Sequence, residues 1–577
     1  MGNNASTLPH AQDSSSSLRS SNGSYIYENY DDDGDTVTCS SIRSSILSPK
    51  MDLLGRPIIR NNLLSCSPSG NRGEEKEEIS CSVNIPTSAS WNSLSDLGAN
   101  GSDTYYTKEE QEMTDGNLPT EESDLRPTVS NVRQFWIVTT AALPWMTGTA
   151  INPLLRAAYL SQMNRQYSSG ISTVTLVLPW LEKAEDRVAL YGSEWKDATQ
   201  SYQEQYIRKW LAQSLPLEAD EDQGGIRISW YAAKYHSRYA SIFAMGDICS
   251  LFGNEKLDVC FLEEPEHLNV YRAPGKRLWT EIFRHVVGVG HTNYVAYVQK
   301  ESLVASAFMY GLSSWMVKAY CHKLIKLSPV LQTFAQEKEV VCNVHGIRSE
   351  FLNVESPQTG VYFLGKLLWA KGLDMLLKLE MDYRKHTGSY FDIDIIGAGP
   401  DEEDIRTSFE AKKVPSNFVG RKDHLEYCTK YKVFVNPSLS EVLCTATAEA
   451  LAMGKFVLCP FHPSNSFFDI FPNCLFYRNK REFVQCMKYA LTHSPEPLSE
   501  DLRYTLTWEA ATERCMDAAI ITRRDARRLD RLGRTKSSLD LARLHNDLNH
   551  GQKGHVFRTI LGAGPVANQQ EFCSISN

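Results

Sequence analysis

The sequence lacks several features that would assign it to a familiar class. It has no uninterrupted apolar run of about 18 residues, so no membrane-spanning helix is predicted. The N-terminus has no apolar signal-peptide core and is too acidic for an ordinary transit peptide. The 14 cysteines include no C-x-x-C pair, which argues against a zinc site or a disulfide framework and favours reduced thiols.

The most apolar stretch, residues 303–317, contains three serines and one glycine and is followed by Lys318. We therefore expect a buried or interfacial helix there, not a transmembrane one. No nucleic-acid partner is expected for this chain, whose net charge is −9.

Charge is distributed unevenly along the chain. The first 125 residues carry a net charge of −12, whereas the remainder sums to +3. The acidic segment is rich in serine and asparagine and shows no strand or helix periodicity, so we expect a disordered arm over residues 1–127. Its first residues fit the N-myristoylation pattern, which makes Gly2 a candidate lipidation site, although so short a pattern also arises by chance.

From residue 135 onward, apolar strand-like runs alternate with longer segments that suit helices. This alternation is typical of parallel α/β sheets. A linker-like segment at residues 353–360 divides the runs into two series. We therefore predict an α/β protein with two Rossmann-like domains that face one another across a cleft, over residues 128–350 and 351–507.

The pattern after Trp508 is helical, and residues 523–577 begin with a basic stretch. We expect a helical or flexible tail there. Such a face is usually only solvated, but it could also meet an anionic membrane surface. The basic residues are Arg523, Arg524, Arg527, Arg528, Arg531, Arg534 and Lys536.

Two glutamates eight positions apart, Glu441 and Glu449, mark the most informative stretch of the chain. Glu441 follows a strand-like run and a Pro-Ser turn, and Glu449 lies in an alanine-rich helical pattern that stops at Gly454. A strand, a turn and a helix form the usual ligand site of an open α/β sheet. Because carboxylates only accept hydrogen bonds, this pair could bind sugar hydroxyls; the alternative is an ordinary α/β turn.

Two lysines, Lys366 and Lys371, follow Gly365 where a predicted strand gives way to a helix. They could meet a diphosphate with help from the helix dipole, or they could be surface residues with solvated head groups. The later sequence Gly397-Ala398-Gly399 begins like a dinucleotide fingerprint, but Glu402 stands at the third glycine position. We reject an NAD site there and expect a strand-to-helix turn.

Two segments of the first domain also carry candidate site residues. The loop Thr147-Gly148-Thr149 follows the first predicted strand, and its amides could face a phosphate or an acceptor hydroxyl, or the loop could simply pack. His291 closes a later strand, at the sheet edge where ligands bind. A lone histidine is more often structural, so both interpretations of His291 stay open.

These residues converge on a resemblance. The Glu441-x7-Glu449 spacing, together with Gly365-Lys366 and Lys371-Gly372, resembles the retaining GT-B glycosyltransferases of family 4. Within that family, several long strings are similar to the enzymes that form galactolipids, and together they cover roughly residues 130–520. The strings lie at residues 139–159, 262–269, 286–294, 341–346, 363–372, 443–453, 463–465 and 508–514.

The resemblance implies a GT-B fold in which a C-terminal helix, over residues 508–522, crosses back onto the first domain. It implies transfer of galactose from UDP-galactose to the 6-hydroxyl of monogalactosyldiacylglycerol, with retention, to give the α-1,6-linked digalactosyldiacylglycerol. The N-terminal domain would take the lipid and the C-terminal domain the nucleotide sugar. No metal or other cofactor would be required, and the enzyme would lie peripherally on the cytosol-facing side of the plastid outer envelope.

The same resemblance implies roles for the candidate residues. Lys366 and Lys371 would stabilise the charge on the departing diphosphate. Glu441 would accept hydrogen bonds from the donor sugar, Glu449 would hold the ribose hydroxyls, and His291 would lie beside the reacting sugar. No enzyme nucleophile is required. The donor-binding set is completed by Gly365, Val442 and Leu443.

Two other interpretations stay open. Another glycolipid glycosyltransferase with a different UDP-sugar would have the same fold, because one sequence does not show which sugar epimer is bound. A non-catalytic GT-B scaffold that binds lipid or nucleotide is the second interpretation. The presence of both glutamates and both lysines argues against the scaffold.

Overall fold

The chain divides into two compact units, Met1–Asp103 and Thr104–Asn577. In the first unit the described residues form two short antiparallel strands, β1 (Lys50–Met51) and β2 (Pro57–Ile58). The other residues of the expected disordered arm lie outside those described. Gly2, the candidate lipidation site, is among them. The computed structural model describes residues 50–51, 57–58, 134–167, 173–215, 225–270, 277–295, 303–354, 359–531, 533–549 and 554.

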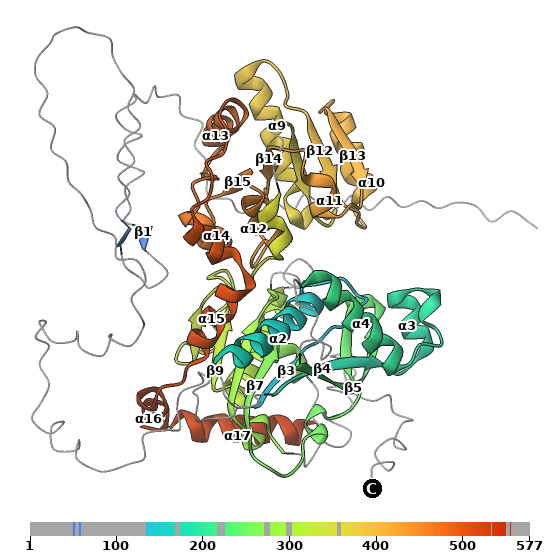
Figure 1. Ribbon diagram of the computed structural model, residues 1–577, viewed down its shortest axis with the longest axis vertical. Helices are drawn as coiled ribbons and strands as arrows, with labels where there is room; N and C mark the ends of the chain where they lie inside the picture. The colour runs from blue at the N-terminus through green and yellow to red at the C-terminus, as the bar shows by residue number, and fades with distance from the viewer. Residues whose placement is uncertain are drawn as a thin grey trace, which may run out of the picture. The chain divides into compact units, whose positions relative to one another are not determined.

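The second unit contains two α/β sheets, as the alternating pattern predicts (Figure 1). The first sheet has eight strands in the order β10-β9-β8-β7-β3-β4-β5-β6, and every neighbouring pair is parallel except β5 with β6. From β3, the chain builds outward through β4 on one side and through β7 on the other. These strands are β3 (Gln134–Val138), β4 (Thr173–Leu181), β5 (Ile226–His236), β6 (Ser241–Ala244), β7 (Leu257–Glu263), β8 (Phe283–Gly290), β9 (Lys323–Lys326) and β10 (Glu339–Val341).

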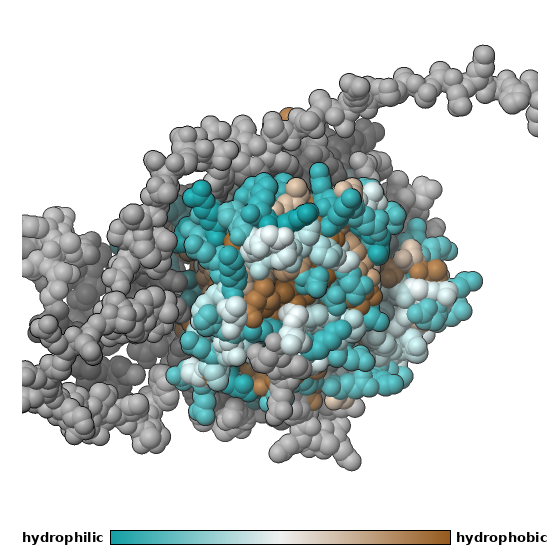
Figure 2. Space-filling view, turned by 90° about the horizontal axis from the view of Figure 1, so that it is seen from above, coloured by the Kyte–Doolittle hydropathy of each residue, from teal (hydrophilic) through white to brown (hydrophobic). Residues whose placement is uncertain are grey.

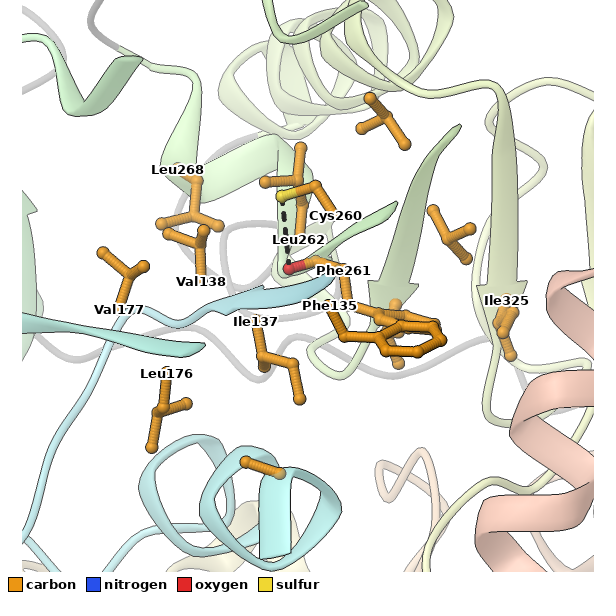
Figure 3. Close-up of a cluster of buried hydrophobic side chains, with 14 of the residues drawn as sticks. Phe135, Ile137, Val138, Leu176, Val177, Cys260, Phe261, Leu262, Leu268 and Ile325 are labelled. Carbon is orange, nitrogen blue, oxygen red and sulfur yellow. Dashed lines mark hydrogen bonds between the residues drawn. The ribbon is translucent and has the colours of Figure 1, made fainter. Parts of the chain in front are cut away.

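The central strands of the first sheet, β3 and β7, are mostly apolar, as expected for parallel strands covered on both faces. Phe135, Ile137 and Val138 of β3 are fully buried, and so are Phe261 and Leu262 of β7. Figure 3 shows these side chains converging above and below the sheet.

The helices of this domain are α2 (Gly148–Tyr167), α3 (Ala184–Tyr191), α4 (Gln200–Ser214), α5 (Pro265–Leu268), α6 (Trp279–Ile282) and α8 (Leu303–Tyr320), with short 3-10 helices η2 (Ser193–Trp195), η4 (Ser237–Tyr239) and η5 (Ile248–Leu251).

The second sheet has six strands, all parallel, in the order β13-β12-β11-β14-β15-β16. The strands are β11 (Val361–Leu364), β12 (Ile393–Ile396), β13 (Ser416–Gly420), β14 (Val433–Val435), β15 (Phe456–Pro460) and β16 (Cys474–Tyr477). The helices are α9 (Leu373–Thr387), α10 (Glu402–Ala411), α11 (His424–Cys428), α12 (Thr445–Ala452) and α13 (Lys480–Thr492), with 3-10 helices η6 (Ser349–Asn353), η7 (Trp369–Lys371) and η8 (Pro463–Ile470).

Close packing explains the two glycines that resemble part of a dinucleotide fingerprint. A Cβ atom on Gly397 would clash with the carbonyl oxygen of Gly365, and one on Gly399 would clash with that of Leu367. The amide of Leu367 donates to the carbonyl oxygen of Ala398 over 3.1 Å. The glycines therefore let the turn after β12 lie against the loop after β11, and the segment is a strand-to-helix turn, as expected.

After the second sheet the chain returns to the first domain through α14 (Glu500–Leu506) and α15 (Trp508–Ala519). Trp508 is buried and stacks on Tyr159 of α2, with ring centroids 6.1 Å apart. The amide of Ile347 donates to the carbonyl oxygen of Leu506 over 2.9 Å, and a Cβ atom on Gly346 would clash with the backbone of Trp508. The crossover helix of the GT-B fold is therefore present.

The basic segment continues as two helices, α16 (Arg523–Arg531) and α17 (Arg534–Leu548). Helix α17 packs on α8 of the first domain: Trp315 Nε1 donates to the carbonyl oxygen of Leu541 over 3.0 Å. The Tyr320 hydroxyl and His545 Nδ1, both buried, are 2.7 Å apart. This part of the expected helical or flexible tail is thus a helix attached to the first domain.

Within the described ranges, no helix combines the length and the apolarity needed to span a bilayer. Figure 2 shows one face of the molecule, on which hydrophilic side chains surround apolar side chains near the centre. Exposed apolar groups therefore occur on this face as a local cluster within a largely hydrophilic surface.

Candidate active site at the carboxyl ends of the strands

Ligands of open parallel sheets bind beyond the carboxyl ends of the strands, at the point where the chain order reverses. The first sheet reverses between β3 and β7, which are paired through Val138 and Leu262. The second sheet reverses between β11 and β14, which are paired through Tyr362 and Phe434. The candidate residues of the two domains follow these strands or their neighbours, so the topology places them where ligands are expected.

Lys371 and Glu441 form an ion pair at the switch point of the second sheet, although they lie 70 positions apart. Both side chains are about four-fifths buried, with exposures of 21% and 22%. Gly372 has a positive φ of 83°, and the absence of a Cβ atom lets its backbone approach the carbonyl oxygen of Pro437. The hydroxyl of Ser440 donates to the carbonyl oxygen of Ala370 over 2.6 Å. Together these contacts hold the loops after β11 and β14 against one another.

Lys366 directly follows Gly365 in the chain, and it is exposed. Within the described residues no ion pair is found for Lys366, so its ammonium group can meet a ligand.

Val442 and Leu443 precede the first residue of α12 by three and two positions. The side chain of the N-cap residue Cys444 accepts no capping hydrogen bond from the amides of α12, and the first amides of a helix lack intrahelical acceptors. An anion at this helix start would therefore find free N–H donors.

His424, a residue that was not predicted from the sequence, hydrogen-bonds to the carboxylate of Glu449. His424 Nδ1 lies 2.6 Å from Glu449 Oε2, and His424 Nε2 lies 2.8 Å from the hydroxyl of Tyr362. Burial raises the pKa of Tyr362 well above its usual value, so the hydroxyl keeps its proton and can donate to Nε2. With Nδ1 donating to the carboxylate, Oε1 of Glu449 makes no hydrogen bond within the described part of the chain. That oxygen remains as an acceptor for a ligand.

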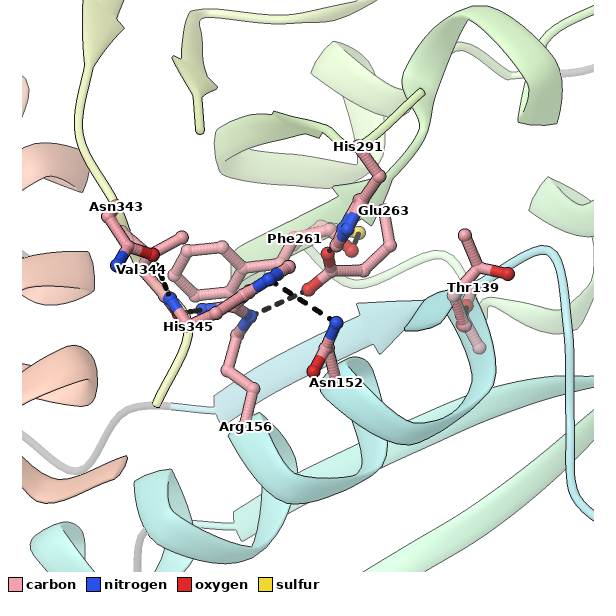
Figure 4. Close-up of polar contacts among 11 residues, drawn as sticks. Thr139, Asn152, Arg156, Phe261, Glu263, His291, Asn343, Val344 and His345 are labelled. Carbon is pink, nitrogen blue, oxygen red and sulfur yellow. Dashed lines mark hydrogen bonds and ion pairs between the residues drawn. The ribbon is translucent and has the colours of Figure 1, made fainter. Parts of the chain in front are cut away.

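His291 contacts a buried ion pair of the first domain (Figure 4). Its Nε2 atom hydrogen-bonds to Glu263 Oε2, while Arg156 Nε donates to Glu263 Oε1 over 2.7 Å. Burial alone would raise the pKa of Glu263, but Arg156 and His291 lower it to about 2. Glu263 is therefore a carboxylate at neutral pH, and it fixes the orientation of the His291 ring at the end of β8.

A second histidine stacks on His291. The ring of His345 lies 5.0 Å from that of His291, and its Nδ1 is 3.3 Å from the side-chain nitrogen of Asn152. Burial, together with the charges of His291 and Arg156, holds the pKa of His345 well below its usual value. His345 is therefore a neutral ring, which supports His291 without adding positive charge beside it.

Glu264 anchors the loop that follows His291. It has a positive φ of 65°, a conformation that few residues other than glycine adopt. The hydroxyl of Thr140 donates to its Oε2 over 2.7 Å, and the hydroxyl of Thr292 donates to its Oε1. The ends of β3, β7 and β8 are thus tied together at the switch point.

The loop Thr147-Gly148-Thr149 begins α2, which starts at Gly148. The two threonine hydroxyls lie 3.2 Å apart, and Thr139 Oγ1 donates to the carbonyl oxygen of Thr149 over 2.6 Å. The loop is therefore packed against the end of β3, and Gly148 at its centre is exposed. The structure is compatible with both the packing interpretation and an amide that faces a ligand.

Across the residues that the structure describes, no cluster of three or more His, Cys, Asp or Glu side chains could hold a metal ion. Five residues of these networks were not predicted from the sequence as site residues. For Glu263 and Glu264 a signal exists, because two adjacent acidic residues stand at the carboxyl end of the buried strand β7, Glu263 as its last residue and Glu264 directly after it. The other three have no such signal, since only folding brings them to the site; they are Arg156, His345 and His424.

Comparisons with known proteins agree with this architecture. A family described as "Glycosyl transferases group 1" matches residues 358–487, which contain most of the second domain. Digalactosyldiacylglycerol synthase 1, chloroplastic, of Arabidopsis thaliana is 43% identical over 405 residues, which are 68% of this chain and 48% of that protein. Digalactosyldiacylglycerol synthase 2, chloroplastic, of Glycine max is 38% identical over 457 residues, which are 75% of this chain and 95% of that protein.

Among solved structures, the lipopolysaccharide outer core galactosyltransferase WaaB in its apo form is similar with a TM-score of 0.42 and 9% identity, over 67% of this chain and 99% of that one. The match spans about half the length of the synthase 1 relatives and nearly all of the synthase 2 relatives. The chain has two α/β domains and a crossover helix, and its 38% identity to a synthase 2 protein, of which it covers 95%, decides the assignment. The chain belongs to the digalactosyldiacylglycerol synthase family of GT-B glycosyltransferases.

Proposed function

We propose that this protein transfers galactose from UDP-galactose to the 6-hydroxyl of monogalactosyldiacylglycerol, with retention of configuration, and so forms digalactosyldiacylglycerol. The observation that carries the proposal is the Lys371–Glu441 pair at the switch point of the second sheet, within the segment that matches the glycosyltransferase family. The names of the relatives supply the substrate class.

The donor binds to the second domain in this proposal. Glu441, which Lys371 orients, accepts hydrogen bonds from the hydroxyls of the galactose. The free oxygen of Glu449 accepts hydrogen bonds from the ribose. The amides of Val442 and Leu443 approach the phosphates, where the start of α12 favours negative charge.

Transfer follows from the charge that develops on the leaving group. The acceptor oxygen forms a bond to the anomeric carbon as the bond from that carbon to the diphosphate breaks, and the diphosphate leaves with the bonding electrons. The hydroxyl proton passes to a departing phosphate oxygen, so no enzyme nucleophile is required. Lys366 and Lys371 stabilise the growing negative charge, and loss of such a preorganised donor typically costs about 2.7–4 kcal/mol. We therefore expect turnover without a metal or another cofactor.

The acceptor binds to the first domain. His291, oriented by Glu263, holds the reacting sugars, and the loop Thr147-Gly148-Thr149 can present an amide to an acceptor hydroxyl. Because the acceptor is a membrane lipid, the protein must work at a bilayer surface. The relatives are named chloroplastic, which supports a plastid location. Within it, the proposal is a peripheral position on the cytosol-facing side of the outer envelope, with the basic residues of α16 toward anionic lipid.

The test is an assay of the full-length chain with radiolabelled UDP-galactose and monogalactosyldiacylglycerol, with lipid products separated by thin-layer chromatography. We expect labelled digalactosyldiacylglycerol, also in the presence of excess chelator. Labelled product from UDP-glucose instead would identify a different glycolipid glycosyltransferase. No product from either donor would overturn the proposal and favour a binding scaffold.

Three variants make the assay specific to the site. Lys371→Ala and Glu441→Gln should remove most of the activity while the chain stays folded. Lys378→Ala is the matched control, because this lysine pairs with Asp374 on the surface of α9 and is 57% exposed. Wild-type rates in both site variants would show that the ion pair is only structural.

A further inference from the structure

The beginning of α8 exposes an apolar surface. Val304 and Leu303 are 82% and 74% exposed, the two highest values among the large apolar side chains in the described ranges. Phe308, one turn after Val304, is 48% exposed, and Tyr310 is 45% exposed. We call Leu303, Val304, Phe308 and Tyr310 the α8 patch. Residues 303–311 contain no charged side chain.

The second half of α8 is buried and holds the first half in place. Leu312, Met316, Val317 and Tyr320 are at most 5% exposed, and Trp315 bonds to α17. The α8 patch therefore projects from a helix that is anchored at its other end. A soluble protein seldom exposes a cluster of large apolar side chains without a function in binding.

The α8 patch adjoins the loop that carries His291. The hydroxyl of Ser306, on the first turns of α8, donates to the carbonyl oxygen of Val295 over 3.4 Å. Val295 lies four residues after His291, which hydrogen-bonds to Glu263 at the end of β7. The hydrogen bond between Ser306 and Val295 thus ties the beginning of α8 to the segment that follows His291.

We propose that the α8 patch inserts into the surface of the bilayer that contains the lipid acceptor. This inference rests on the proposed function, because a galactolipid presents its sugar to His291 while its acyl chains remain in an apolar medium. Leucine, valine and phenylalanine side chains supply apolar area for such shallow insertion. Tyr310 has an exposed ring and a hydroxyl that bonds to the carbonyl oxygen of Thr333 over 3.1 Å, which suits an aromatic residue at a membrane interface.

A lipid surface fits the α8 patch better than a second copy of the chain does. A stable protein interface takes roughly 20–30 residues from each partner, including a polar rim. The α8 patch has four large residues and no charged residue within residues 303–311. Its size and composition therefore match local insertion into lipid.

The experiment uses the full-length chain and vesicles of phosphatidylcholine that contain monogalactosyldiacylglycerol. Both lipids are without net charge, so the basic tail contributes little, and high salt screens the remainder. The test variant is Leu303→Ser/Val304→Ser/Phe308→Ser. The matched control is Val188→Ser/Leu251→Ser/Tyr202→Ser, which removes three apolar side chains that are 36%, 41% and 50% exposed elsewhere in the same domain. Binding is measured by sedimentation with the vesicles.

We expect the test variant to bind the vesicles at least about tenfold more weakly than the wild type, and the control to bind as the wild type does. Both should transfer galactose at the wild-type rate to galactosylglycerol, a water-soluble acceptor without acyl chains. Equal vesicle binding by the test variant would overturn the inference. So would a loss of self-association, measured by analytical ultracentrifugation, that leaves vesicle binding unchanged.

The same experiment separates this inference from the proposed function. If the wild type transfers galactose to neither acceptor, the proposed function fails, while a difference in vesicle binding still supports the membrane contact of the α8 patch. If the wild type transfers galactose and the variant binds vesicles normally, only the inference about the α8 patch fails.

Discussion

His424 Nδ1 lies 2.6 Å from Glu449 Oε2, so a histidine at the start of α11 fixes a carboxylate that lies 25 positions later in α12. The contact leaves only one oxygen of Glu449 for a ligand. It also makes His424 a positioning residue, because it acts on the donor site through Glu449 and does not need to touch the donor itself.

Replacing His424 with alanine should therefore weaken donor binding more than it slows transfer. A hydrogen bond to a charged group is worth about 1.5–3 kcal/mol, so we expect the KM for UDP-galactose to rise at least tenfold while kcat changes little. Steady-state kinetics with a fixed acceptor concentration measure both values. His424→Gln, which can still donate to the carboxylate, should recover part of the loss, and His386→Ala on the surface of α9 is the control. A fall in kcat with an unchanged KM would contradict the positioning role.

Lys371 and Glu441 should behave as a unit in a double-mutant cycle. Lys371→Ala and Glu441→Gln should each lower kcat/KM by roughly 10²–10³-fold, as the loss of a charge-stabilising group does. Because each residue orients the other, the double variant should lose less than the product of the two single effects. Fully multiplicative losses would show that the two side chains act independently.

The Arg156–Glu263 ion pair should contribute to stability only as a complete pair. Both side chains are almost fully buried, so Arg156→Met leaves the Glu263 carboxylate with only His291 as a charged partner and should cost about 3–5 kcal/mol in denaturant-induced unfolding. The double variant Arg156→Met/Glu263→Leu should recover much of this free energy. Arg208→Met is the control, because its pair with Glu204 is about 30% exposed and exposed pairs contribute about 0–1 kcal/mol. Equal losses in the single and double variants would contradict the explanation.

Glu380 should make the stability of the second domain depend on pH. It is fully buried on α9, and burial raises its pKa from 4.5 to about 9. Because the folded-state pKa lies above the unfolded one, the stabilising contribution is complete below about 4.5 and is lost as the pH rises through about 9. Glu380→Gln is always neutral, so the variant should gain in melting temperature relative to the wild type between pH 6 and pH 9, whereas the exposed change Glu403→Gln should not. Parallel melting curves across this range would refute the prediction.

The sequence predicts those parts of the fold that depend on local pattern. Apolar runs such as 135–138 and 259–262 become the buried strands β3 and β7, and the turn at Gly397 lies where its glycines suggest. The Lys371–Glu441 pair joins two motifs that each follow a strand, and the two strands are neighbours in the sheet, so the topology brings them together.

Contacts made by chain segments far apart in sequence could not be predicted in this way. Arg156 meets Glu263 over 107 positions, and α17 returns to α8 over more than 200 positions. No local sequence pattern predicts either contact, because the partners of a buried arginine or of an amphipathic helix are set by the folded structure of the domain. The basic residues within 523–536 predicted a surface in contact with solvent or lipid. In the structure, α17 packs on the first domain through Ala542 and His545, which are fully buried.

The packing of the crossover helix α15 also affects the order in which the two domains can complete folding during synthesis. Trp508, Ala511 and Ala519 of α15 belong to the same buried cluster as the strands of the first domain. Domains usually fold as they leave the ribosome, the N-terminal one first. Here the N-terminal domain cannot complete its core until α15 and also Ala542 of α17 have been translated, so the C-terminal domain, although made later, is the first whose sheet and covering helices are all available.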